Sequence, residues 1–183
     1  MALLHENLVN DPSLKDRILG LKNNSMDMID GILFYVNLLR EYIEGSDCEE
    51  YFGIITEYMH KYERYYDGVD CYISDDIDGF LNSIKPINEP CIYKMNHPIT
   101  ILYDPAIVLN ACTELMNLAH KLYTECADII DIMLRIHEKD LKNVQNGNIC
   151  QAVSRFNYDI NSKIESCIME MIGYLREIIL IYI

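Results

Sequence analysis

Apolar side chains recur every three or four residues along most of the chain, which is the spacing of one face of an α-helix. The longest such stripe follows Pro105 and continues without interruption through Val108, Cys112, Leu115, Ala119, Leu122, Cys126, Ile129, Met133 and Ile136. Leu109, Met116, Tyr123 and Ile130 widen it beyond the narrow seam of a two-stranded coiled coil. The pattern therefore predicts a long bundle helix, with a break near Thr124 as the alternative.

A second long stripe occupies the end of the chain. It runs through Ile149, Val153, Phe156 and Ile160 and, after a stutter, through Ile164, Cys167, Met171, Leu175, Ile178 and Tyr182. Because neither glycine nor proline occurs from Ala106 to Asn146, the preceding helix is expected to reach a turn at Asn146-Gly147-Asn148. Two long helices joined by a tight turn pack antiparallel. Residues 104–183 are thus predicted to form a long helical hairpin.

Shorter helices are predicted over residues 10–85 from their start and stop signals. The starts are Asp11-Pro12, Ser25, Ser46 and Ser74, and the ends of the second, third and fourth helices are Gly45, Gly68 and Pro86. The third helix carries Tyr51, Ile55, Tyr58, Tyr62 and Tyr65 on one face. These segments are expected to form a first antiparallel hairpin.

Residues 86–103 interrupt the helical pattern with Pro86, Pro90 and Pro98. Residues 91–95 and 99–103 are typical of extended chain, either as a short β-hairpin around Asn96-His97-Pro98 or as a strap across the bundle. We therefore predict one all-α domain over residues 1–183. It is a bundle of six or seven helices in which the proline-rich segment joins two antiparallel helical hairpins.

Charge and composition exclude several classes of function. The chain has 15 basic and 29 acidic residues, for a formal charge of -14. It would repel the phosphates of nucleic acids and anionic membrane surfaces. No stretch reaches the roughly 18 apolar residues that a membrane span requires. Seven cysteines without a CxxC pair, and an N-terminus unlike a signal peptide, indicate a reducing, cytoplasmic environment.

The sequence offers weak candidates for metal binding. Glu57-x-x-His60 has the spacing of a di-iron ligand pair, but no second copy occurs at His120 or His137, so an exposed polar face is the simpler interpretation. A zinc site would have to gather Cys71, Cys91 and His97 from distant positions. The aspartates between Asp67 and Asp78 do not have the spacing of an EF-hand loop. We predict no catalytic, cofactor-binding or metal-binding residues, and a protein that is not an enzyme.

Tyrosine is the most distinctive residue type, with 14 copies and no tryptophan. A group of aromatic and sulfur-containing side chains crowds the third helix and its end: Tyr58, Met59, Tyr62, Tyr65, Tyr66 and Tyr72. Tyrosine is enriched at binding surfaces because its ring buries a large area with little loss of rotamer freedom. These six residues are the predicted partner-binding surface, and packing against the second hairpin is the alternative.

The favoured function is an adaptor, inhibitor or regulatory subunit that binds another protein, for example by taking an amphipathic helix into a groove. In size, acidity, helix number and abundant Ile, Asn, Asp and Tyr, the chain resembles the Bcl-2-like immune modulators of poxviruses. That resemblance implies modulation of host apoptosis or innate immune signalling. The alternatives are a metal-binding helical-bundle enzyme and a structural subunit, and a homo-oligomer is compatible with each.

Overall fold

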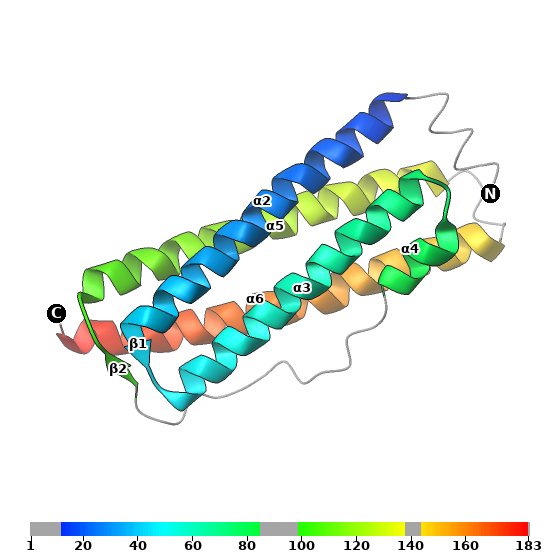
Figure 1. Cartoon of the computed structure of the whole chain (residues 1–183). Coiled ribbons are helices and arrows are strands. Elements are labelled where there is room, and N and C mark those ends of the chain that lie inside the picture. Colours follow the sequence, from blue (N-terminus) through cyan, green and yellow to red (C-terminus); the bar gives the residue numbers. More distant parts are fainter. Residues whose placement is uncertain (1–11, 85–98, 138–143, 183) are drawn as a thin grey trace.

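The structure is a computed structural model that describes residues 12–84, 99–137 and 144–182 (Figure 1). Four long helices account for most of them: α2 (Pro12–Tyr42), α3 (Ser46–Ile73), α5 (Pro105–His137) and α6 (Val144–Tyr182). A short helix, α4 (Ile77–Ser83), follows α3, and two two-residue strands, β1 (Ile43–Glu44) and β2 (Thr100–Ile101), complete the described elements. The predicted all-α bundle is confirmed.

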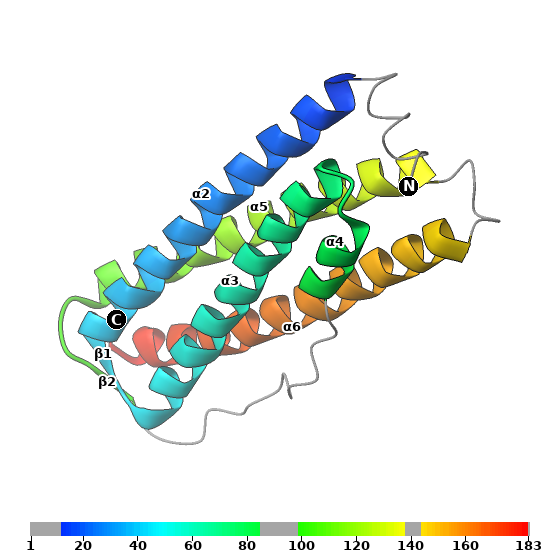
Figure 2. The same ribbon diagram turned by 45° about the vertical axis from the view of Figure 1, so that its right-hand side comes forward.

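The long helices lie side by side in two antiparallel pairs, α2 with α3 and α5 with α6 (Figures 1 and 2). Each pair also packs on the other, because α2 contacts α5 and α3 contacts α6. Helix α3 begins after β1 at one end of the bundle and ends near α4 at the opposite end. Helix α5 begins after β2, at the same end as β1, so α3 and α5 run in the same direction (Figure 1). The two predicted helical hairpins are present, including the long C-terminal one.

A small antiparallel ribbon ties the two hairpins together at one end. Ile43 of β1 pairs with Ile101 of β2, and the Leu102 N–H donates to the Tyr42 carbonyl over 2.8 Å. Residues 99–103 are extended in part, as predicted, but they pair with β1, which directly follows α2. A Cβ on Gly45 would lie 2.8 Å from Cγ2 of Ile99, so glycine lets the two segments approach. The predicted β-hairpin around residues 96–98 lies outside the described residues.

The predicted helix start at Ser25 is wrong, because α2 is continuous from Pro12 to Tyr42. Ser25 is fully buried, and its hydroxyl donates a hydrogen bond of 2.8 Å to the Leu21 carbonyl one turn earlier. A serine whose side chain bonds back to its own helix in this way is compatible with a helix interior. The proline at the first helical position behaves as predicted.

The predicted end of α3 at Gly68 is also wrong, since the helix continues to Ile73. Gly68 is buried, and a Cβ there would lie 1.8 Å from Oγ of Ser83 in α4. Glycine is therefore needed for the close approach of α4 to α3. The fourth helix begins at Ile77, three residues after the predicted start, and the Asp76 carboxylate caps it by accepting from the Gly79 N–H over 3.0 Å.

The turn predicted at residues 146–148 is wrong, because these residues lie in the first turn and a half of α6. The preceding helix ends at His137, directly after the last stripe residue, Ile136. The nine stripe residues of α5 are buried, except for the partly buried Ala119.

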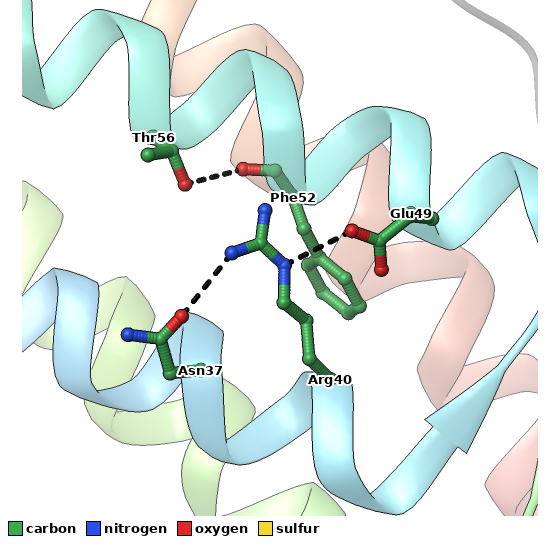
Figure 3. A network of polar contacts seen from close by, with 5 residues as sticks. All are labelled: Asn37, Arg40, Glu49, Phe52 and Thr56. Carbon is green, nitrogen blue, oxygen red and sulfur yellow. Dashed lines mark hydrogen bonds and ion pairs between the residues drawn. The ribbon is translucent and has the colours of Figure 1, made fainter.

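The junction between α2 and α3 is held by Arg40 (Figure 3). Its guanidinium lies over the Phe52 ring, 5.9 Å from the centroid, and its Nη1 donates to the Asn37 side chain over 3.2 Å. Nε lies 3.2 Å from the exposed carboxylate of Glu49 on α3. Because an exposed ion pair contributes little, the stabilising part of this contact is the guanidinium placed over the Phe52 ring.

Candidate functional site

The six residues of the predicted partner-binding surface lie inside the bundle. Tyr58, Met59, Tyr62, Tyr65, Tyr66 and Tyr72 are each 0–1 % exposed. The exposed tyrosine patch expected from the sequence is therefore not formed, and the side chains pack against the other helices. The physical reason is their spacing, which places the tyrosines on the same face of α3 as the buried Phe52 and Ile55.

Three of these tyrosines gather around the Cys126 thiol of α5. The Tyr62 and Tyr66 rings stack with centroids 6.1 Å apart, and Tyr65 stacks on Phe156 of α6 at 4.8 Å. Burial, followed by the neighbouring thiol, raises the pKa of the Tyr62, Tyr65 and Tyr66 hydroxyls well above the usual range. These hydroxyls stay protonated at neutral pH, so none of them is an activated base or nucleophile.

The cysteines within the described ranges are free thiols, and three of them are fully buried. Burial is the largest cause that raises the pKa of Cys48, Cys112 and Cys126 to about 12. At pH 8 roughly one thiol in 10⁴ is then the reactive thiolate.

We expect iodoacetamide to modify the half-buried Cys71 and Cys150 first, as measured by peptide mass spectrometry. Cys126 is fully buried, so its alkylation requires opening of the bundle and should be much slower than that of Cys71 and Cys150. Rapid labelling of Cys126 at pH 8 would contradict this.

A buried polar pair closes the end of the bundle near α4. The Tyr72 hydroxyl and Nε2 of His137 lie 2.7 Å apart, and both side chains are at most 1 % exposed. Tyr72 is on α3 and His137 is the last residue of α5, so the hydrogen bond links two diagonal helices. Such a bond satisfies two polar groups that would otherwise be buried alone, which is a structural role.

The candidate metal ligands do not converge. Glu57 and His60 lie on the exposed face of α3, where Nδ1 of His60 is 3.2 Å from the Glu63 carboxylate. No group of three or more His, Cys, Asp or Glu side chains within residues 12–84, 99–137 and 144–182 is arranged to hold a metal ion. Cys91 and His97 lie outside the described ranges, so the proposed zinc set is not described.

A groove between α5 and α6 is a concave site in the described part of the chain. Its volume is about 680 Å³, and apolar side chains from both helices line it, together with the buried Tyr62 of α3. Two large apolar residues at the groove are exposed, Tyr123 of α5 by 43 % and Met169 of α6 by 53 %. The sequence pattern placed Tyr123 on the widened core stripe and left Met169 outside the α6 stripe, so sequence reasoning missed this site.

Polar and charged side chains also line the groove: Glu114, Asn117, His120, Lys121 and Glu165. Glu114 of α5 is half-buried and Glu165 of α6 is exposed. Neither carboxylate forms an ion pair within the described part of the chain, and the same holds for Lys121 on the α5 side. The groove thus combines an apolar lining with two carboxylates that have no partner of opposite charge.

Comparison of the chain with protein-family models, with curated proteins and with solved structures finds no match. None of the helices in the described ranges combines the length and the apolar character needed to cross a lipid bilayer. The groove is therefore the feature of the molecule that bears on its function.

Proposed function

We propose that the chain is a protein-interaction module that docks a partner protein in the groove between α5 and α6. The observation that carries this proposal is the exposure of Tyr123 and Met169 at one concave site, from the two helices that form its walls. Tyrosine and methionine are enriched at the centres of protein interfaces, where they bury large areas. Single exposed apolar side chains are common on protein surfaces, so it is the pairing of these two at one concave site that favours a partner which covers them.

The lining of the groove supports binding over catalysis. Met116, Leu118 and Ile168 contribute apolar surface, and two carboxylates, one lysine and one histidine are the titratable groups on the described α5 and α6 walls. No carboxylate and histidine there are joined by a hydrogen bond of the kind that activates a nucleophile, within the ranges that the structure describes. A concave, largely apolar site bordered by two helices is a geometry into which a helical segment can dock.

Affinity capture with groove variants tests the proposal. Tyr123→Lys and Met169→Lys place a charge where a partner would bury apolar surface, and we expect each to reduce partner recovery at least about tenfold. The matched control is Tyr158→Lys, because Tyr158 is 75 % exposed on α6 and does not line the groove. Recovery is measured by quantitative mass spectrometry from cells that express each variant.

The variants must first be shown to fold, by thermal unfolding followed with circular dichroism. Because all three substituted side chains are at least 43 % exposed, we expect stability changes within about 0.5 kcal/mol. Equal recovery of the same partner by wild type, Tyr123→Lys and Met169→Lys would show that the groove is not the docking site.

A further inference from the structure

We infer that the segment that occupies the α5–α6 groove is a cationic amphipathic helix of the partner protein. This inference rests on the proposed function and adds the chemistry of the partner. It is carried by the charge of the groove, whose two carboxylates, Glu114 and Glu165, outnumber its single lysine, Lys121, and form no ion pair in the described ranges.

The α5 wall of the groove is long enough for about two turns of a bound helix. It extends from Glu114 to Tyr123, about 14 Å at 1.5 Å per residue, whereas the α6 wall, from Glu165 to Met169, covers about one turn. Apolar anchors at positions i, i+3 or i+4, and i+7 of a bound helix cover about 10 Å. Methionines on both walls, Met116 and Met169, adapt to different anchor shapes because their side chains are unbranched.

The two carboxylates determine which polar residues flank those anchors. Docking removes water from the groove, which strengthens the field of the half-buried Glu114 and raises the cost of leaving it unpaired. A lysine or arginine beside the apolar anchors would pair with Glu114 or Glu165 and recover that cost. An acidic helix would instead place like charges together, which disfavours binding.

The charge of the entire chain acts in the same direction. A formal charge of -14 attracts a basic partner over a distance of several ångströms and accelerates its association. The same charge opposes a second copy of this chain in the groove, since two such molecules repel each other. A basic segment from a different protein is therefore favoured over self-association.

A display library tests the inference. We would select peptides with fixed leucines at helical spacing and random polar positions on the full chain, with a counter-selection on the Tyr123→Lys variant. The expected result is a set of binders that depend on Tyr123 and are enriched in lysine and arginine. Their affinity should fall about tenfold in the E114Q/E165Q double variant and decrease with added salt.

The control for net charge is the E57Q/D67N double variant, which removes the same charge from the exposed face of α3. It should leave peptide affinity within about twofold of wild type. Binders that depend on Tyr123 but lack basic residues, or that tolerate E114Q/E165Q, would overturn the inference and leave groove docking intact. If no selected peptide depends on Tyr123, or the wild-type chain self-associates through Tyr123, both the inference and the proposed function fail.

Discussion

Replacing Tyr65 by alanine is expected to lower the free energy of unfolding by about 3–5 kcal/mol. The Tyr65 ring is fully buried, stacks on Phe156 with centroids 4.8 Å apart and meets Tyr66 edge-on at 5.0 Å. Truncation removes these contacts and leaves a cavity between α3 and α6 that rigid helices cannot close. Urea unfolding followed by circular dichroism measures the change.

Tyr65→Phe separates the ring from its hydroxyl. The hydroxyl is buried and makes no hydrogen bond of normal geometry with the described residues, although the Cys126 thiol is nearby. We therefore expect phenylalanine to be neutral or slightly stabilising. Tyr158→Ala, at a site that is 75 % exposed, should change stability by less than about 0.5 kcal/mol. A loss above about 1 kcal/mol in Tyr65→Phe would show that the hydroxyl has a partner.

Gly68→Ala is expected to destabilise the protein by about 1–3 kcal/mol, although alanine favours helix by about 1 kcal/mol over glycine. The added methyl group would lie 2.4 Å from Cβ of Ser83, which no side-chain rotation relieves. The helix α4 must therefore shift away from α3 and expose part of the contact between Tyr72 and Phe80, whose ring centroids are 5.1 Å apart. Urea unfolding again reports the loss.

A second substitution tests whether the close approach is the cause. Ser83→Gly removes both the hydroxyl and Cβ, so the nearest remaining atom to an alanine methyl at position 68 is the Phe80 carbonyl oxygen at 3.6 Å. The double variant should recover most of the stability lost in Gly68→Ala, relative to Ser83→Gly alone. Strictly additive losses would place the effect elsewhere.

The helical class and the pairing of helices followed from hydrophobic periodicity, because the stripe residues whose side chains the structure describes are buried, apart from the partly buried Ala119. The stripe from Val108 to Ile136 and the tyrosine face of α3 both point to the core. The α3 tyrosines are therefore buried as the apolar spacing predicts, although tyrosine is common at protein surfaces.

Helix boundaries were predicted less well, because single residues have several roles. Ser25 and Gly68 have the chemistry of a helix start and a helix end, yet each lies within a helix. One is satisfied by the Leu21 carbonyl and the other is needed for contact with Ser83. Ser25 is satisfied within its own helix, which its residue type alone does not indicate. The role of Gly68 depends on Ser83 in a different helix, so a local pattern does not contain it.

The groove had one signal in the sequence, which is the stutter between Ile160 and Ile164. A stutter shifts the buried face of a helix, so the residues after it need not continue the earlier stripe. Ile168, which is outside the predicted stripe, is 1 % exposed, whereas its neighbour Met169 is 53 % exposed at the groove. How far two helices separate at such a shift depends on their packing, which periodicity alone does not specify.

The order of the helices along the chain affects how the protein folds during synthesis. The largest interface of α2 is with α5, which is synthesised much later, so the apolar surface of α2 stays uncovered until then. A nascent chain that ends before Pro105 lacks α5 and α6, so it exposes apolar surface to other polypeptides. Chaperones that bind nascent chains should therefore engage this protein until translation passes α5.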